Sequence, residues 1–356
     1  MDIQLLEQNR INILNKLLNS RKILVIASKP IDKDSICTAL SIDWFVRKIG
    51  NNLIDTDIVV FSNMPFEVSF VPNVDKVKQF YIREIDFNKY DCIILVDGNS
   101  WKQFFTIHPE RYLSNIEKSK LINIDHHFEG EIEKYIYDSF VRVEDVCTAK
   151  VFYDYFISKS NLQLDIEVAE YLFSAVIGDT GNFRHGIKQD TFKFAQMLVD
   201  VGINVSKLTY SPIQRISIDI MFWMYKNTIF VDEIKCMIFK LDNKLRQEAT
   251  IVFGKSWEFD NYDFWYKLYF GGNILNYPYF LKFSEDEISK KRVRISWRRS
   301  NWNADVNIME VLKSCGFVVG GHINAGGGYV ENISIDEAIE SFITKMKVQE
   351  QSRLKQ

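Results

Sequence analysis

Short apolar runs, each about as long as one β-strand, constrain the fold of this chain more than any other feature. They are rich in Ile and Val, helical patterns lie between several of them, and they span residues 23–27, 58–61, 92–96 and 121–124. Strands that are apolar along their whole length are typical of a parallel sheet with helices on both faces. We therefore expect an α/β fold whose N-terminal part is a mainly parallel, doubly wound sheet.

The remaining elements follow from the spacing of apolar residues. Helical spacing predicts helices over 3–18, 148–159, 165–177, 190–201 and 335–346. Strand patterns predict a hairpin or two short strands within 228–240 and single strands over 277–283 and 291–297. A glycine-rich turn is predicted for 320–328, and the aromatic-rich stretch 244–280 indicates no particular element.

A length of 356 residues fits two domains better than one. The character of the sequence changes near residue 203, although no Pro- or Ser-rich tract marks the change. We predict a larger domain over 1–202, a linker over 203–227 and a smaller α/β domain over 228–356.

Composition narrows the class of protein. A net charge of −3 argues against coating long nucleic acid, but it leaves room for a local basic pocket. The five cysteines are far apart and odd in number, which indicates buried thiols in a reducing compartment. The first residues lack the pattern of a signal peptide, and no apolar run reaches the length of a membrane span. We expect a cytoplasmic protein that does not act on membranes.

Three of the apolar runs lead directly to acidic residues. These are Asp32 and Asp34, then Asp97, and then Asp125 with His126 and His127. Ligands bind beyond the carboxyl ends of the strands in an open parallel sheet, so these side chains are expected to converge. A single aspartate at such a position is explained equally well as a helix cap or turn residue. All of them together favour a shared site.

The mixture of carboxylates and imidazoles indicates which cation such a site would hold. It suits Mn²⁺, with Mg²⁺ or Fe²⁺ as alternatives. A cysteine-rich zinc site has no ligand set in this chain.

The segment Asn123-Ile-Asp-His-His resembles the signature of the DHH phosphoesterases, the superfamily that also contains family II inorganic pyrophosphatases. Other blocks resemble family motifs in the same order: Asp32-x-Asp34, Asp97 after a strand, Cys147-Thr-Ala-Lys, and 176–184 with Asp179 and Arg184. Residues 296–298, 305–307 and 320–326 resemble the DHH-associated C-terminal domain. A lone D-H-H would be weak evidence, but these ordered blocks together are specific.

The resemblance implies a role for each matching residue. Two metal ions would be bridged by Asp97, which is a catalytic residue together with His127. Asp32 would bind the first ion, and the second would be held by Asp34, His126 and Asp179. His127 would face the substrate phosphate. Such a pair of ions activates a water and neutralises the attacking and leaving oxygens.

The C-terminal blocks would bind the substrate. Arg298 lies at the family's S-x-R position, where its planar fork suits a phosphate. Gly320 and Gly321 before His322 would let backbone N–H groups approach a phosphate, although a glycine turn before a helix explains them as well. Arg184 is a further substrate contact or a structural ion pair. For Arg292 and Arg294 we favour charge protection of an edge strand.

One residue departs from the family pattern. Ser28 occupies the position where the first motif of the family has a histidine. Either the first metal site is weaker, or His185 or water completes it, or catalysis is impaired.

The resemblance implies hydrolysis of phosphoester bonds in short nucleotides, as in oligoribonucleases that also dephosphorylate 3′-phosphoadenosine 5′-phosphate. The cleft between the two domains is the expected active site. Cleavage of cyclic di-AMP or of linear pApA is the alternative, and exonuclease or pyrophosphatase activity ranks lower. A nucleotide-binding protein without turnover is the rival from another class. A homodimer is left open, and long duplex nucleic acid is not an expected partner.

Overall fold

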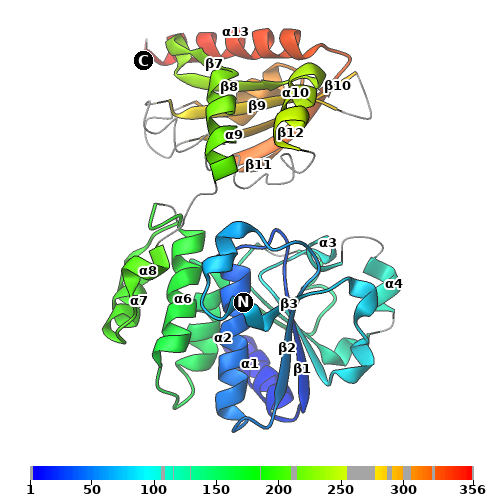
Figure 1. Cartoon of the computed structure of the whole chain (residues 1–356), viewed down its shortest axis with the longest axis vertical. Helices are drawn as coiled ribbons and strands as arrows, with labels where there is room; N and C mark the ends of the chain where they lie inside the picture. Colours follow the sequence, from blue (N-terminus) through cyan, green and yellow to red (C-terminus); the bar gives the residue numbers. More distant parts are fainter. Residues whose placement is uncertain are drawn as a thin grey trace. The chain divides into compact units, whose positions relative to one another are not determined.

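A computed structural model describes residues 3–105, 109–114, 116–128, 130–184, 186–209, 215–254, 277–286, 291–299, 306–322 and 325–354. The chain divides into two compact units, Met1–Pro212 and Ile213–Gln356 (Figure 1). The division falls within 203–227, the range given above to a linker. The same range contains α8 (Val205–Thr209) and α9 (Arg215–Lys226), and the exact domain limits stay a prediction.

The first unit is built on a six-stranded sheet in which every neighbouring pair is parallel. Its strand order is β3-β2-β1-β4-β5-β6. The strands are β1 (Lys22–Ala27), β2 (Asp55–Val60), β3 (Val77–Gln79), β4 (Cys92–Val96), β5 (Leu121–Asp125) and β6 (Asp138–Val141). The predicted doubly wound α/β fold is confirmed.

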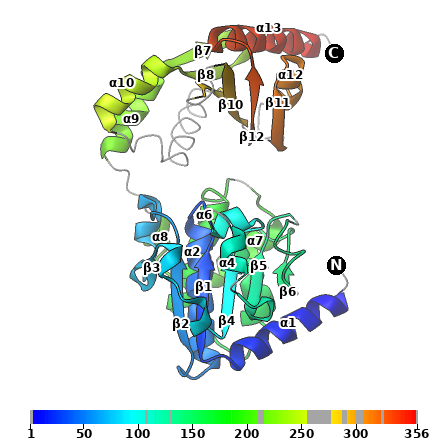
Figure 2. The same ribbon diagram turned by 90° about the vertical axis from the view of Figure 1, so that its right-hand side faces the viewer.

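Side chains of these strands enter two separate cores, one on each face of the sheet. Helices lie on both sides of this sheet (Figure 2). In β1, Ile23 and Val25 join one core while Leu24 and Ile26 join the other. The first core is covered by α1 (Ile3–Leu18), α2 (Lys33–Ile49), α5 (Thr148–Phe152), α6 (Ile166–Asp179) and α7 (Gln189–Asp200). The second core is covered by α3 (Trp101–Phe104), α4 (Pro109–Leu113) and the nearby turns. Burial on both faces explains the continuous apolar runs in β1, β2, β4 and β5.

The strand order reverses between β1 and β4. From β1 the chain moves outward through β2 to β3, then returns to β4 and continues through β5 to β6. The loops after β1 and β4 therefore leave the sheet in opposite directions. A doubly wound sheet binds its ligands at such a switch point.

The predicted helices of the first unit are confirmed, those over 3–18, 165–177 and 190–201 within two residues. The helix predicted over 148–159 consists of α5 followed by a π-helical turn at Tyr153–Ile157.

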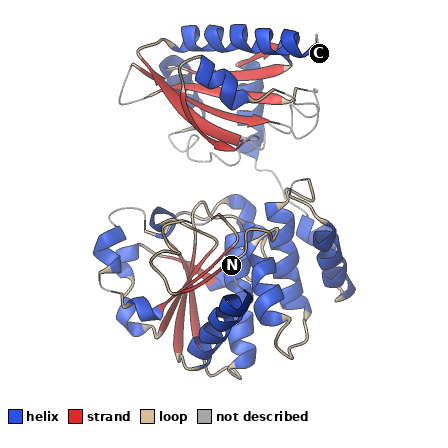
Figure 3. Cartoon of the chain, turned by 180° about the vertical axis from the view of Figure 1, so that it is seen from behind, coloured by secondary structure: helices blue, strands red, loops and turns tan. Residues whose placement is uncertain are grey.

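The second unit contains a mixed sheet between two layers of helices (Figure 3). The strand order is β11-β12-β10-β9-β8-β7, and β8 and β9 form a parallel pair. The strands are β7 (Thr228–Val231), β8 (Cys236–Leu241), β9 (Tyr279–Glu285), β10 (Arg292–Arg299), β11 (Val318–His322) and β12 (Ala325–Glu331). One face packs against α9 and α10 (Asn243–Phe253), and the other against α12 (Ile308–Ser314) and α13 (Ile335–Leu354).

The prediction of a glycine-rich turn over 320–328 is wrong, because most of these residues lie in β11 and β12. Glycine is instead needed at two of these positions because neighbouring atoms leave no room for a side chain. A Cβ added to Gly326 would lie 2.1 Å from the Trp297 ring, and one on Gly328 would lie 2.3 Å from the Val318 carbonyl oxygen. Glycine is required there because the neighbouring atoms come so close.

The assignment of β10 as an edge strand is also wrong, since it lies between β9 and β12. Its alternation is confirmed, because Val293, Ile295 and Trp297 are buried. Arg292 forms an ion pair with Glu331, and Arg294 Nε lies 2.8 Å from Asp286 Oδ2. These arginines therefore pair with neighbouring acids and protect no edge.

Part of the stretch without a predicted element is α10, and residues 255–276 lie outside the described part of the chain. Among the described residues, no helix is both long and apolar enough to cross a bilayer.

We predict that Gly326→Ala destabilises the second unit, because the new methyl group collides with the buried Trp297 ring. Overpacking of this kind costs about 1–3 kcal/mol in the free energy of unfolding. Gly320→Ala is the matched control in the neighbouring strand, since a Cβ there meets nothing within 4 Å. Urea unfolding of both variants measures the difference. Equal stabilities would contradict the packing role of Gly326.

Candidate metal centre

The first acids of the site follow β1 and begin α2. Asp32 caps this helix, with its Oδ1 accepting a hydrogen bond from the Ser35 backbone N–H at 2.9 Å. Asp34 lies in the first turn and is 1% exposed. Its carboxylate accepts hydrogen bonds from the backbone N–H groups of Thr148 (2.6 Å) and Ala149 (3.0 Å). Helix α5, which packs with α2 in the first core, therefore meets α2 at this carboxylate.

Asp97 lies directly after β4, on the other side of the switch point. Its φ of +65° is in the left-handed region, which is uncommon for a residue other than glycine. The side chain is buried, and Oδ1 accepts a hydrogen bond from the Thr148 hydroxyl at 2.8 Å. A left-handed residue held by a buried hydrogen bond is a common feature of functional sites.

His126 follows β5 and turns its ring toward the acids. Its Nδ1 lies 3.3 Å from the backbone carbonyl oxygen of Asp145. A carbonyl only accepts hydrogen bonds, so Nδ1 carries the proton and Nε2 presents a lone pair. Nε2 lies 3.2 Å from Asp179 Oδ2, 3.7 Å from Asp97 Oδ1 and 3.9 Å from Asp34 Oδ2. This is the tautomer that a metal-binding imidazole requires.

Asp179 is the last residue of α6, and an unusual turn follows it. Gly181, Asn182 and Phe183 all have positive φ angles, of 55°, 59° and 61°. The buried Thr180 hydroxyl accepts a hydrogen bond from the Phe183 backbone N–H at 2.9 Å. The chain thereby turns sharply away just after the carboxylate that faces His126.

The ligand atoms form two overlapping groups, each within 4.8 Å. One comprises Asp97, His126 and His127, and the other comprises Asp34, His126 and Asp179. Asp32 belongs to neither group in the described part of the chain, although its charge acts on Asp97 and Asp179. The residues predicted as metal ligands therefore converge, with Asp32 at the margin.

Burial and mutual repulsion disfavour the charged forms of these acids. Burial and the neighbouring carboxylates raise the pKa of Asp97 and of Asp179 well above the usual range for aspartate. Burial, with the charge of Asp34, raises the pKa of Asp32 to about 6. Cations relieve both effects by replacing the lost hydration and neutralising the charge. The donor set of carboxylates and imidazoles therefore fits a divalent metal ion.

His127 is oriented by Asp125, a residue to which the sequence analysis gives no role. Its Nδ1 donates to Asp125 Oδ1 at 2.7 Å, and this hydrogen bond raises the pKa of His127. Asp125 is buried, and its Oδ2 has no hydrogen-bond partner in the described structure. The sequence does contain a signal for this residue, because Asp125 is the aspartate of the Asp-His-His motif.

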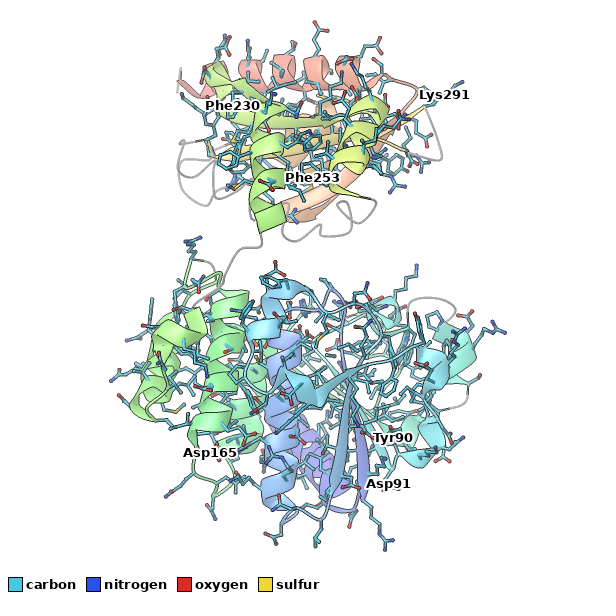
Figure 4. All side chains as sticks on the ribbon, viewed as in Figure 1. Tyr90, Asp91, Asp165, Phe230, Phe253 and Lys291 are labelled. Carbon is cyan, nitrogen blue, oxygen red and sulfur yellow. The ribbon has the colours of Figure 1, made fainter. Side chains whose placement is uncertain are left out.

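Acids at the other end of the sheet behave differently. Figure 4 labels Asp91 beside Tyr90, where β4 begins. The backbone N–H groups of Arg21 and Lys22 hold the pKa of Asp91 below its usual value. The pKa of Asp91, at the start of β4, is thus shifted in the opposite direction from the pKa values of Asp32, Asp97 and Asp179.

Ser28 is buried directly after β1, and its backbone N–H donates to the Val96 carbonyl at 3.2 Å. It therefore lies at the switch point, beside the chain that leads to Asp97. A Cβ added to Gly98 would lie 3.1 Å from Ser28 Cβ, so this corner is tightly packed. His185, offered as a replacement ligand, lies outside the described residues.

The residues predicted to bind substrate are divided between the units. Arg184 is exposed five residues after Asp179. Arg298 on β10 and His322 on β11 are both backbone partners of Ala325 on β12, so they share one row of the second sheet. Gly320 and Gly321 precede His322 in β11. Arg298 Nη1 donates to the Trp297 carbonyl at 2.8 Å, and burial lowers the pKa of Arg298.

Residues 22–176 match the family described as DHH family, N-terminal domain. This part of the chain is similar to the N-terminal domain of that family. It contains Asp32, Asp34 and Asp97 and the two histidines of the signature, while Asp179 lies just beyond the matched range.

Two curated relatives are similar to the same part of the sequence. The chain is 30% identical over 161 residues to a probable manganese-dependent inorganic pyrophosphatase of Brevibacillus brevis, covering 45% of this chain and 48% of the relative. It is 27% identical over 190 residues to a protein of the same description from Bacillus cereus, covering 52% and 57%. The chain thus spans about half the length of these relatives.

Similarity of fold extends beyond the residues that match the family. An exopolyphosphatase-related protein of Bacteroides fragilis has a similar structure, with a TM-score of 0.73 and 18% identity over 98% of both chains. This likeness concerns the fold alone, and it covers both units.

We predict that the metal-free protein loses stability as the pH rises through the folded-state pKa of Asp32. A carboxyl whose folded pKa is raised favours the fold fully below its unfolded pKa of about 4, and this contribution is lost above about 6. Asp32→Asn keeps a good helix cap and removes the charge. In chelator at pH 7.5 it should raise the free energy of unfolding by about 1–2 kcal/mol, with little effect at pH 4.

Asp91→Asn is the control of opposite sign, because the lowered pKa of Asp91 means that its carboxylate favours the fold at neutral pH. This variant should lose stability at pH 7.5. Chemical unfolding of both variants at the two pH values gives the comparison. A destabilised Asp32→Asn variant at pH 7.5 would refute the electrostatic reading.

Proposed function

We propose that this chain is a metal-dependent phosphoesterase that hydrolyses phosphoester bonds in short nucleotides. The observation that carries the proposal is the convergence of Asp34, Asp97, His126 and Asp179 at the switch point of a DHH domain. Their carboxylate and imidazole donors suit Mn²⁺, and the two curated relatives above are described as manganese-dependent. Mg²⁺ and Fe²⁺ are the alternative ions.

We propose two ions, as the resemblance to the DHH phosphoesterases implies. Asp34, His126 and Asp179 would hold one ion. Asp97 would hold the other with Asp32, and would bridge the two. When bound, such a pair supplies a hydroxide nucleophile and neutralises charge on the phosphate oxygens. Asp97 is held for this task by its own left-handed backbone and by the Thr148 hydroxyl.

His127 would hold the substrate phosphate and supply a proton. Its Nδ1 is engaged by Asp125, and its side chain is 44% exposed. The other ring nitrogen is therefore available to a ligand at the rim of the acid cluster. The raised pKa of His127 keeps more of the imidazole protonated near neutral pH, so it can donate to a phosphate oxygen or to the leaving group.

The second unit would bind the rest of the nucleotide. Arg298 and His322 share one row of the sheet, and Gly320 and Gly321 precede His322 along β11. A guanidinium fork binds phosphate in a bidentate manner, and small residues let a ligand approach the backbone. Arg184 in the first unit is a further proposed phosphate contact.

Among substrates, short oligoribonucleotides and 3′-phosphoadenosine 5′-phosphate rank first, and cyclic di-AMP or pApA second. The Gly-Gly-His block in β11 supports the nucleotide branch of the superfamily. The descriptions of the curated relatives support inorganic pyrophosphate as the next candidate. A binding protein without turnover has one supporting feature, the serine at position 28. The retained ligands Asp34, Asp97, His126 and Asp179 oppose it.

The deciding experiment is a hydrolysis panel with Mn²⁺ that contains 3′-phosphoadenosine 5′-phosphate, di- to pentanucleotides, cyclic di-AMP and pyrophosphate. We expect turnover of the first two classes, and loss of it in excess chelator. Asp97→Ala should lower kcat by more than the roughly 10- to 100-fold typical of lost outer-shell partners. The folding of this variant is checked by circular dichroism. Activity in excess chelator would exclude the metal mechanism. A preference for pyrophosphate would replace nucleotides by pyrophosphate as the proposed substrate.

We further predict that Arg298→Ala lowers kcat/KM while leaving Mn²⁺ affinity unchanged, because Arg298 lies in the unit without the acid cluster. Loss of one charged hydrogen bond should cost roughly 1.5–3 kcal/mol, or about 10- to 150-fold in kcat/KM. Arg294→Ala is the matched control, since Arg294 lies on the same strand and pairs with Asp286. Equal kcat/KM values for the two variants would remove Arg298 from the substrate site.

A further inference from the structure

Helix α5 donates hydrogen bonds to two carboxylates of the acid cluster. The backbone N–H groups of Thr148 and Ala149 donate to the two carboxylate oxygens of Asp34, one to each. The Thr148 hydroxyl donates to Asp97 Oδ1. Two carboxylates that follow different strands are therefore fixed by one helical turn.

The same helix also contacts His126, through an intermediate. Lys150 is 5% exposed, and its ammonium group lies 3.0 Å from Asp145 Oδ1. It also pairs with Asp154 and, at 3.3 Å, with Asp190. Asp145 in turn offers its backbone carbonyl to Nδ1 of His126. Lys150 thus anchors the loop that sets the direction of the His126 ring.

We infer that Thr148 and Lys150 are positioning residues for the metal centre. Thr148 sets the separation of the Asp34 and Asp97 carboxylates, and Lys150 sets the tautomer and orientation of His126 through Asp145. Neither residue lies in either group of ligand atoms. The inference rests on the proposed function, because it assumes that these side chains bind a divalent cation.

Energetics explain why such a device is needed. Carboxylates of like charge repel one another when buried together, and each would turn away if its neighbours allowed it. Hydrogen bonds from the backbone of α5 and from the Thr148 hydroxyl oppose this movement. They keep the carboxylate oxygens in positions where a cation can bind them. Outer partners of this kind typically change metal affinity by 10- to 100-fold.

The first test concerns Thr148 and measures Mn²⁺ affinity by isothermal titration calorimetry of the full chain. Thr148→Val removes the hydroxyl while keeping the shape, and should raise the Kd for Mn²⁺ by about 10- to 100-fold. Thr148→Ser keeps the hydroxyl and should bind nearly as the parent does. Thr191→Val is the control, because Thr191 is also buried and caps α7 without touching the cluster.

The second test separates the path through Asp145 from the general ion pairing of Lys150. Asp145→Asn and Asp154→Asn each weaken one ion pair of Lys150, yet only Asp145 contacts His126. Asp145→Asn should raise the Kd for Mn²⁺ by about 10-fold, whereas Asp154→Asn should change stability alone. This pair is preferred to removal of Lys150, which would leave three acids together without their cation.

The outcomes are distinguishable from failure of the proposed function. If the parent chain binds no Mn²⁺, the proposed function fails. If the parent binds Mn²⁺ and Thr148→Val binds it equally tightly, the role of Thr148 is overturned. Equal Kd values for Asp145→Asn and Asp154→Asn overturn the role of Lys150. The rise in melting temperature on adding Mn²⁺ provides a second readout, independent of hydrolysis.

Discussion

The repulsion among acids gathered at one edge of the parallel sheet is the constraint on which the first unit depends. Asp32, Asp34, Asp97 and Asp179 act on one another's charge, and burial deprives them of water. Isolated charges in such surroundings would take up protons or separate. The fold instead supplies fixed donors: the backbone N–H groups of α5 to Asp34, the Thr148 hydroxyl to Asp97 and the Ser35 backbone N–H to Asp32. These three acids stay close to one another because each has its own donor.

Topology explains why these residues can be held at all. The reversal between β1 and β4 sends the following loops in opposite directions, so the acids after these strands line one crevice. Asp97 itself has a left-handed backbone, and three left-handed residues turn the chain away shortly after Asp179. Such conformations are unfavourable on their own and persist where the surrounding structure fixes them. The strands bring the acids close to one another, and the left-handed backbone at Asp97 orients its carboxylate.

Much of this could be predicted from the sequence, for identifiable physical reasons. The four apolar runs predicted the central strands because burial on both faces leaves a continuous signal. The edge strands β3 and β6 are short and half-polar, and they carry no such signal. The glycines of β12 were misread because their reason, contact with Trp297 from another strand, is not local in sequence. Asp125 and Thr148 lay inside recognised motifs, but their roles depend on partners distant along the chain.

Holding ligands in place before the metal arrives has a consequence for the energetics of the whole unit. Each unit by which a carboxyl pKa is raised represents about 1.4 kcal/mol of unfavourable interaction at neutral pH. A cation present at 100 times its Kd stabilises the folded state by about 2.7 kcal/mol. The two quantities are of similar size, so metal binding offsets the repulsion that the fold maintains. If the acids could move apart in the absence of metal, the metal-free protein would be more stable. The acids would then have to be brought together again each time a metal ion binds. The hydrogen bonds of α5 prevent that relaxation, and metal affinity and metal-free stability are therefore expected to oppose each other at this site.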